Sequence, residues 1–313
     1  MADNDGQWER GLIEKLATEA LKEQRRARRW GIFWKLLTFA YITVVLVLAI
    51  DWKGGESKGG KHTALVEISG VIAPGTDASA EKVATALQAA FKDKNTQGVV
   101  LRINSPGGSP VQSQNIYDEM KRLRLKYPAI PLYAVVEDLC ASGGYYVAAA
   151  ADRIYVAKGS IVGSIGVRMD NFGLVGLMEK LGIERRLITA GKNKALLDPF
   201  LPLEESHKQI ATDLIGEIHQ QFIAAVRDGR GKRLKETPDM FSGLIWSGAK
   251  SVELGLADAL GGLDYVAREV IKAEDIVDYT QKENLAEKVA RRFGAGAMNS
   301  LIEFAVRSGL AVR

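Results

Sequence analysis

Short apolar runs alternate with segments of helical periodicity through most of the chain. The apolar runs are rich in β-branched residues and short enough for buried strands, at 64–68, 98–103, 132–136, 153–156 and 185–189. Between them, apolar residues recur every three or four positions, which predicts helices at 79–94, 111–127, 172–181 and 204–227. A second strand-and-helix passage, 245–271, closes the region. This alternation predicts an α/β fold with a mainly parallel sheet and covering helices.

The N-terminal part of the chain has a different pattern. Residues 1–29 are polar and helix-prone and end in a basic cluster, whereas 30–52 is apolar and about the length needed to cross a bilayer. Tryptophans flank this span, as at membrane interfaces: Trp30, Trp34 and Trp52. A secretory signal peptide is the alternative, but Asp-Trp-Lys at 51–53 is a poor cleavage site. We therefore predict a single-pass transmembrane anchor with a cytoplasmic N-terminus and the rest of the chain on the far side of the membrane.

Two further segments flank the predicted globular region, which spans residues 63–275. Residues 53–62 are Gly-rich and charged, which is typical of a flexible tether. Residues 276–313 form a tail, and from Asn284 its apolar side chains recur four apart, opposite basic ones. That pattern predicts an amphipathic helix packed on a partner subunit, with a membrane-surface helix as the alternative.

Composition argues against several classes of protein. The chain has 313 residues and a net charge of +4, much of it near the N-terminus, so we expect no nucleic-acid partner. A single cysteine, Cys140, cannot form an intrachain disulfide or a cysteine metal site. The histidines lack ligand spacing, so we expect no metal centre: His62, His207 and His219. No nucleotide-binding signature is present, and we expect no cofactor.

Ser142 is the strongest candidate for chemistry. It follows the predicted strand 132–136 and precedes two glycines and an Ala-rich stretch that predicts a packed helix. A serine at such a turn has its hydroxyl near free backbone amides at the positive end of the helix, the setting that an acyl-transfer nucleophile needs. Ser142 could instead be a plain N-cap. Cys140 could be a thiol nucleophile, but we favour a buried core residue because no histidine is close in sequence.

Three other stretches carry residues that this chemistry could use. Asn104-Ser-Pro-Gly-Gly-Ser109 follows a predicted strand, and its paired glycines could aim amides as an oxyanion hole requires; a plain turn is the alternative. Gly163-Ser-Ile-Gly-Val167 is a second Gly/Ser turn. The loop 191–199 contains two lysines, and a lysine can deprotonate a serine when burial lowers its pKa. Spacing does not choose between Lys192 and Lys194, and the histidines lie in the tether and the long helix.

Together, four motifs resemble those of the signal peptide peptidase A family: Asn104-Ser-Pro-Gly-Gly108, Ala141-Ser-Gly-Gly-Tyr-Tyr146, Gly163-Ser-Ile-Gly-Val167 and Gly191-Lys-Asn-Lys194. These are membrane-anchored serine peptidases with the ClpP/crotonase-like fold, and the resemblance covers about 64–271. By position, it implies that Ser142 is the nucleophile and Lys194 the general base. It also implies that Ser164 orients the lysine and that the amides of Gly108 and Gly143 are the oxyanion donors.

The resemblance also implies an assembly and a substrate. This chain holds one copy of the motif set, as in the short form, which assembles into rings where one subunit's lysine serves the next subunit's serine. We therefore expect a ring-shaped homo-oligomer on the periplasmic side of the bacterial inner membrane. It would degrade cleaved signal peptides and similar apolar, unfolded peptides through an acyl-enzyme. The alternatives are a related peptidase that cleaves membrane-protein segments, a crotonase-like acyl-thioester enzyme, and an inactive scaffold.

Overall fold

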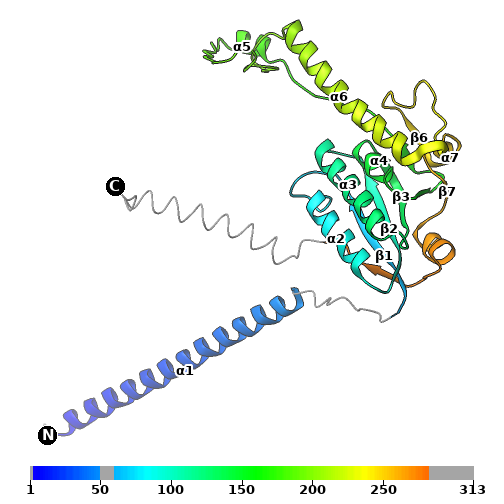
Figure 1. Cartoon of the computed structure of the whole chain (residues 1–313). Coiled ribbons are helices and arrows are strands. Elements are labelled where there is room, and N and C mark those ends of the chain that lie inside the picture. Colours follow the sequence, from blue (N-terminus) through cyan, green and yellow to red (C-terminus); the bar gives the residue numbers. More distant parts are fainter. Residues whose placement is uncertain (1–2, 50–59, 282–313) are drawn as a thin grey trace. The chain divides into compact units, whose positions relative to one another are not determined.

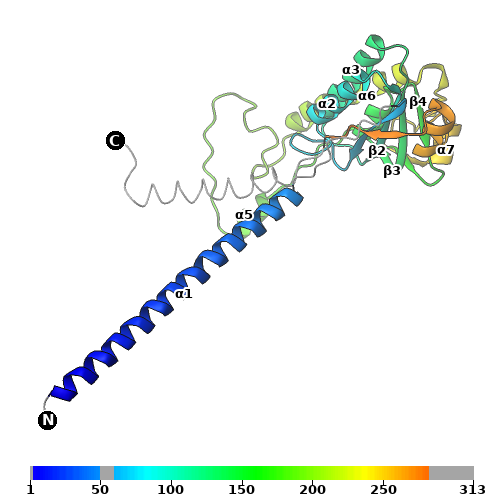
Figure 2. The same cartoon turned by 90° about the horizontal axis from the view of Figure 1, so that it is seen from below.

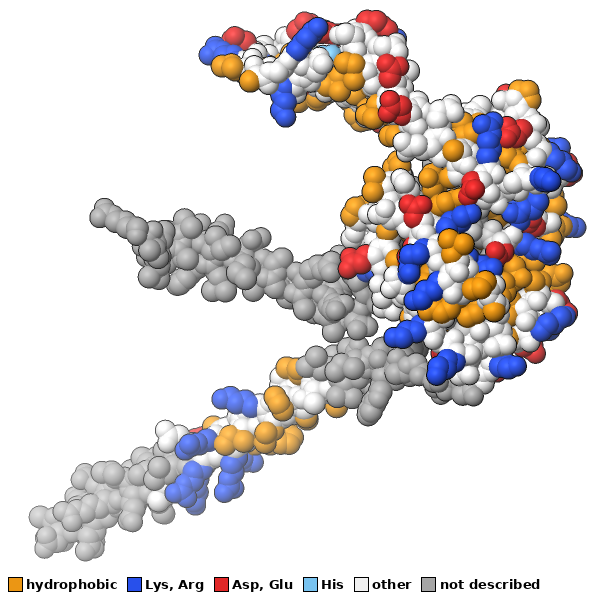
Figure 3. All heavy atoms as spheres, viewed as in Figure 1, with side chains coloured by type: hydrophobic (Ala, Val, Ile, Leu, Met, Phe, Trp, Pro, Cys, Tyr) orange, Lys and Arg blue, Asp and Glu red, His pale blue; other side chains and the backbone are white. Residues whose placement is uncertain are grey.

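The computed structural model describes residues 3–49 and 60–281, which fall into two separate units (Figure 1). In the first unit, the described residues form one long helix, α1 (Asp3–Ala49). Exposed basic side chains, Lys22 to Arg29, are followed along α1 by exposed apolar ones, Trp30 to Val44 (Figure 3). Where side chains are described, no helix has a stretch long and apolar enough to cross a membrane. The side chains of residues 45–52, which belong to the predicted span 30–52, lie outside the described part of the chain.

The second unit is built around an eight-stranded sheet. Along the sheet the strands follow the order β6-β5-β3-β2-β1-β8, with β4 paired to both β3 and β7. Among the described strands, β5 and β6 pair antiparallel and the other pairs are parallel, which confirms the predicted mainly parallel α/β sheet. The strands are β1 (His62–Ser69), β2 (Thr96–Ser105), β3 (Leu132–Ala141), β4 (Arg153–Val156), β5 (Ile161–Gly163), β6 (Ile245–Ser247), β7 (Ala259–Leu260) and β8 (Ile276–Asp278).

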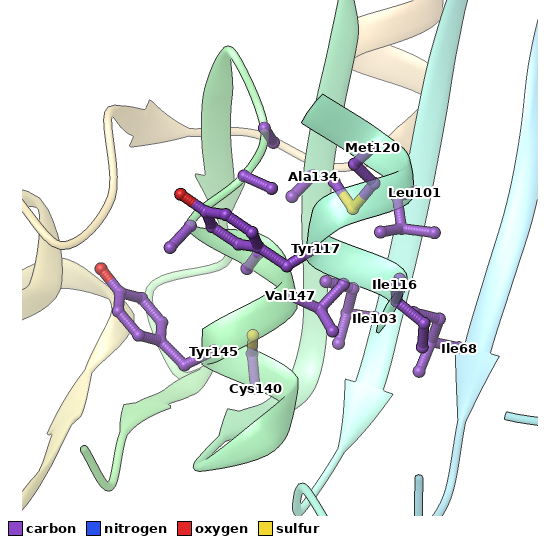
Figure 4. Packing of buried hydrophobic residues seen from close by; sticks show 14 of the residues in the cluster. Ile68, Leu101, Ile103, Ile116, Tyr117, Met120, Ala134, Cys140, Tyr145 and Val147 are labelled. Carbon is purple, nitrogen blue, oxygen red and sulfur yellow. The ribbon is translucent and has the colours of Figure 1, made fainter. Parts of the chain in front are cut away.

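Helices cover both faces of this sheet because successive side chains of a strand point to opposite faces. Val66 and Leu101 belong to the larger apolar cluster, with residues of α2, α3 and α4. Figure 2 shows α2 and α3 next to each other beside the sheet, and Figure 4 shows Leu101 near Met120 of α3. The neighbouring residues Leu65 and Val100 pack on the other face, near Val266. The helices are α2 (Ala80–Lys92), α3 (Pro110–Lys126), α4 (Gly143–Ala148), α5 (Val175–Lys180), α6 (Glu205–Arg230), η1 (Gly231–Arg233), α7 (Gly248–Glu253), α8 (Leu263–Tyr265) and η2 (Val266–Ile271).

The sheet forks along β3. Its first half, Tyr133 to Val136, pairs with β4, whereas its last residues, Leu139 to Ala141, pair with β5. On its other side β3 pairs with β2 as far as Cys140. The strand therefore runs past the end of β4 and delivers the chain to Ser142 beside the carboxyl ends of β1 and β2. In parallel sheets this edge is where ligands usually bind.

A buried ion pair ties the C-terminal end of α6 to the sheet. The Arg230 side chain is fully buried, and its Nη1 lies 2.8 Å from Oδ2 of Asp258. The same carboxylate accepts a 2.7 Å hydrogen bond from the amide of Ile154 in β4. Burial alone would raise the pKa of the Asp258 carboxyl, but the hydrogen bond and charge of Arg230, with the Ile154 amide, hold it below its ordinary value.

The structure corrects several sequence predictions. The predicted strand 185–189 is wrong: this stretch is irregular, and no described strand lies beside it to satisfy its backbone. Of the predicted helix 172–181, only α5 forms. His62 lies in β1 rather than in a tether, and its Nε2 contacts the hydroxyl of Tyr279 at 3.0 Å. β8 pairs with β1, so the sheet extends past the predicted boundary at residue 276; the tail from 282 lies outside the described residues.

Candidate active site

Ser142 occupies a strained turn between β3 and α4. Its backbone has φ 50° and ψ −123°, a left-handed conformation that residues with a side chain rarely adopt. The turn is held at both ends: the Ser142 amide donates to Gly163 at 2.8 Å, and its carbonyl accepts from the Tyr146 amide at 2.9 Å. The side chain makes no capping hydrogen bond to α4. Helix capping therefore does not account for this serine.

The backbone amides of Gly108 and Gly143 lie close together beside Ser142. A Cβ atom built on Gly143 would lie 3.2 Å from the nitrogen of Gly108, and one on Gly107 would lie 2.8 Å from the Ser142 Cβ. Within the described part of the chain, neither the Gly108 nor the Gly143 amide donates a backbone hydrogen bond. Two free amides next to a serine hydroxyl form the arrangement that binds a tetrahedral oxyanion.

Ser142, Gly108, Gly143 and Ser164 line one cleft of about 700 Å³. The cleft therefore brings together four of the five site residues expected from the sequence. Its walls come from loops at the carboxyl ends of the strands and from α3, α4 and α6, and they are mainly apolar or uncharged. The side chains that shape it include Val71, Tyr146, Val167, Ile218 and Phe222, with Arg168 as the charged residue among its described lining.

Ser164 enters the cleft from the turn that follows β5. It has a positive φ of 53°, and its amide donates a 2.7 Å hydrogen bond to the carbonyl of Leu244. The preceding Gly163 also has a positive φ, and a Cβ there would lie 2.6 Å from the ring of Trp246. The Gly163-Ser-Ile-Gly-Val167 motif thus needs glycine for a close approach to β6, and the turn places the Ser164 hydroxyl in the same cleft as Ser142.

Lys194 is the expected site residue that this chain does not bring to the cleft. It is exposed, as is Lys192, in a loop between α5 and α6, and neither lysine is among the lining residues. In Figure 1 this loop lies at the far end of α6 from α4. Within a single copy, the structure therefore separates the candidate base from the candidate nucleophile.

The other candidate nucleophile and bases do not reach the cleft. Cys140 is fully buried among apolar residues, and this burial raises the pKa of its thiol far above the ordinary value, which excludes a reactive thiolate (Figure 4). His219 is the histidine whose sequence neighbours line the cleft, but its Nε2 contacts the carbonyl of Ile165 at 3.2 Å. His207 lies near Glu204. None of the three histidines is among the described lining residues.

Fold and site together define a ClpP-like α/β domain with a serine and two glycine amides in one cleft. Comparison with known families agrees: the Clp protease profile matches residues 59–157, and the Peptidase family S49 profile matches residues 124–277. A candidate protease of Methanocaldococcus jannaschii is 32% identical over 268 residues, which are 81% of this chain and 85% of that protein. The chain therefore belongs to peptidase family S49, a family of serine proteases.

Two further relatives extend this comparison. A candidate signal peptide peptidase of Enterococcus faecium is 28% identical over 233 residues, 72% of this chain and 67% of that protein. A protein of Brucella abortus named as a Na(+)/H(+) antiporter is 45% identical over 177 residues, 56% of this chain. This chain matches 24% of the antiporter's length.

Several side chains that shape the site were not predicted from the sequence. Ser105 and Ser113 are fully buried serines beside the paired glycines, and a Cβ on Gly143 would lie 2.4 Å from the Ser113 Oγ. Tyr146 and Phe222 pack against each other in the cleft wall, with ring centroids 5.0 Å apart and ring planes tilted by 35°. The motif at 104–108 contains Ser105, but nothing in the sequence distinguishes it from an ordinary turn serine.

Proposed function

We propose that this chain is a serine endopeptidase in which Lys194 of a neighbouring copy is the general base for Ser142. The observation that carries the proposal is the set of residues that line the cleft. The cleft contains a serine and two free amides, yet its described lining has no histidine, lysine, aspartate or glutamate that could accept the serine proton. The ionisable side chains there are Arg168, whose guanidinium has donors but no acceptor, and Tyr146, whose pKa is raised by burial.

The proposed reaction proceeds through an acyl-enzyme. The neutral amine of Lys194 removes the Ser142 proton as Oγ forms a bond to the substrate carbonyl carbon. The amides of Gly108 and Gly143 hold the oxyanion, which is worth about 3 kcal/mol per donor in other enzymes. When the C–N bond breaks, the lysine returns the proton to the leaving amine. Water then attacks the ester with the same amine as base, and Ser164 orients the lysine between these steps.

The surface of the segment that carries Lys194 supports a second copy as its partner. Large apolar side chains are exposed throughout residues 169–203, an arrangement that monomeric proteins avoid and that subunit interfaces use. The exposed residues are Met169, Phe172, Leu177, Leu181, Ile183, Leu187, Ile188, Phe200 and Leu203. A ring of copies would cover this surface and carry each Lys194 toward a neighbouring cleft.

The lining of the cleft supports an apolar, extended peptide as substrate. Val71, Val167, Ile218 and Phe222 offer apolar contacts, whereas Arg168 is exposed and paired with Asp170 at 3.6 Å. Cleaved signal peptides have this character, and such peptides are released at membranes. We include in the proposal that the exposed apolar part of α1 anchors the chain in a bacterial inner membrane, with the cleft on the periplasmic side. Extraction of the protein from membranes by carbonate, without detergent, would contradict this part.

Mixing two inactive variants tests the shared site. Ser142→Ala and Lys194→Ala chains should each be inactive alone, and co-expression should restore activity. With random mixing in a ring, about one quarter of the sites would join an intact serine to an intact lysine. A fluorophosphonate tests the nucleophile: it should label Ser142 in the wild-type protein and fail to label the Ser142→Ala variant. Labelling without rescue would place the base within one chain, and absence of labelling would overturn the peptidase proposal.

A further inference from the structure

Ser105 lies close to the paired glycines, and its hydroxyl connects three segments of the chain. Its side chain is fully buried at the end of β2. The hydroxyl donates a 2.7 Å hydrogen bond to the carbonyl of Gly70 and accepts a 3.1 Å hydrogen bond from the amide of Gly107. One hydroxyl therefore links the segment after β1, the end of β2 and the loop that carries Gly108.

The direction of the Gly108 amide depends on the peptide plane that it shares with Gly107. The carbonyl of Gly107 accepts a 2.9 Å hydrogen bond from the amide of Ile72. In a trans peptide the carbonyl and the following N–H point in opposite directions, so this bond turns the Gly108 N–H away from Ile72 and toward the cleft. Gly107 is buried and Gly108 is exposed, which agrees with this orientation.

Two consecutive glycines make this orientation easy to lose. Gly107 and Gly108 have φ of 97° and 152°, and glycine reaches alternative backbone conformations at little cost. The hydrogen bond from Ile72 holds the plane between the two glycines, while the preceding plane, which contains the Gly107 N–H, is held by the Ser105 hydroxyl. Without that hydroxyl, the buried Gly107 amide would lack its partner, and rotation of the loop would become favourable.

We propose that Ser105 is a positioning residue, whose hydroxyl fixes the Gly107 peptide so that the Gly108 amide faces the oxyanion. Ser105 does not touch the substrate and acts through Gly108. This inference rests on the proposed peptidase function, and it adds a residue to that site whose removal should affect the transition state more than the bound substrate.

The test compares Ser105→Ala with a matched control, Ser251→Ala. Ser251 is also fully buried, and its hydroxyl also donates a 2.7 Å hydrogen bond to a glycine carbonyl, that of Gly248 in α7, away from the cleft lining. Both variants should lower the melting temperature. Ser105→Ala alone should lower kcat, by about 10- to 100-fold, somewhat less than the loss seen when an oxyanion donor is removed outright. Its KM should stay near the wild-type value.

A second variant separates positioning from stability. Ser105→Thr keeps the hydroxyl but adds a methyl group at a fully buried position, so it should melt at a lower temperature than Ser105→Ala and still have the higher kcat. Binding of a peptide aldehyde, which forms an oxyanion on Ser142, should weaken in Ser105→Ala by a factor similar to the loss in kcat.

Three outcomes would overturn the proposal. A kcat of Ser105→Ala within twofold of that of Ser251→Ala would show that the hydroxyl does not position the amide. If kcat falls in step with melting temperature across Ser105→Ala, Ser105→Thr and Ser251→Ala, the role of Ser105 is structural only. A wild-type protein that neither cleaves peptides nor labels at Ser142 would overturn both this proposal and the proposed function.

Discussion

The amide of Ser142 donates a 2.8 Å hydrogen bond to the carbonyl of Gly163, and this bond joins the candidate nucleophile to the turn that carries Ser164. It forms because β3 runs past β4 and pairs with β5 through its last residues. The fork in the sheet therefore brings two serines, 22 positions apart in the sequence, into one cleft. Neither serine could reach this position if β3 ended where its apolar run ends, at Val136.

Replacement of Ser142 by glycine should stabilise the fold relative to replacement by alanine. Both changes remove the nucleophile and should abolish turnover. The left-handed backbone at Ser142 is strained for any residue with a Cβ, so Ser142→Gly should unfold with a free energy about 1 kcal/mol higher than Ser142→Ala. Urea denaturation of the two variants measures this difference. Equal stability would show that the turn relaxes without cost.

A substitution at Gly143 should be partly rescued by a second one at Ser113. The Cβ of Gly143→Ala would lie 2.4 Å from the Ser113 Oγ, so the variant must displace either the buried serine or the oxyanion amide. We expect Gly143→Ala to lose about tenfold or more in kcat. Gly143→Ala/Ser113→Ala should recover part of this loss. A double-mutant cycle measures the coupling, and strictly additive effects would contradict the predicted contact.

The two exposed lysines of the loop between α5 and α6 should differ sharply in their effect on activity. Lys194→Ala should nearly abolish turnover, because a base and its nucleophile act as a unit, whereas Lys192→Ala should keep most of it. Lys192 is a matched control, since it lies two positions away and is also exposed. Measurement of kcat for both variants decides between them. A loss of activity in Lys192→Ala but not in Lys194→Ala would show that Lys192 is the base.

Removal of the Asp258 carboxylate should destabilise the domain strongly. Asp258→Asn leaves the buried Arg230 guanidinium without its counter-charge, and breaking a buried pair in this way costs about 3–5 kcal/mol. The unfolding free energy from urea denaturation at pH 7 checks this value. Arg227→Ala is a suitable control, because it removes an ion pair with Glu236 in which both side chains are substantially exposed. A loss no larger than that of the control would contradict the prediction.

The same ion pair should make the stability of the domain depend on acidic pH. The pKa of Asp258 is lower in the folded protein than its ordinary value of about 3.9, so its ionisation stabilises the fold above that pH. The stabilisation is lost as the pH falls through the lowered pKa. The difference in unfolding free energy between the wild type and Asp258→Asn should therefore be constant from pH 7 to about 5 and shrink below about 4. A difference that persisted unchanged into this acidic range would contradict the lowered pKa.

The alternating pattern of the chain was enough to predict its α/β class and the approximate position of each long element. Periodicity works where burial on one face is continuous, as in β2 and α3, because side-chain spacing then reports the backbone. It failed at 185–189, where an apolar stretch stays exposed, and at β5 and β8, which are too short to show a period. β5 and β8 form because each pairs with a strand that is distant in the sequence.

For the candidate site too, the sequence predicted some features and the tertiary structure decided others. Paired glycines after strands indicated free amides, and the family resemblance pointed to Ser142, Ser164, Gly108 and Gly143, which meet in one cleft. The strained φ of Ser142, the direction of the Gly108 amide and the contacts of Ser105 depend on hydrogen bonds between segments that lie 21 positions apart for Ser142 and 35 for the other two. Residue type and local spacing therefore determined which groups this protein has available for catalysis. Tertiary structure decided their orientation, because long-range hydrogen bonds select one peptide-plane geometry among the many that glycine and serine allow.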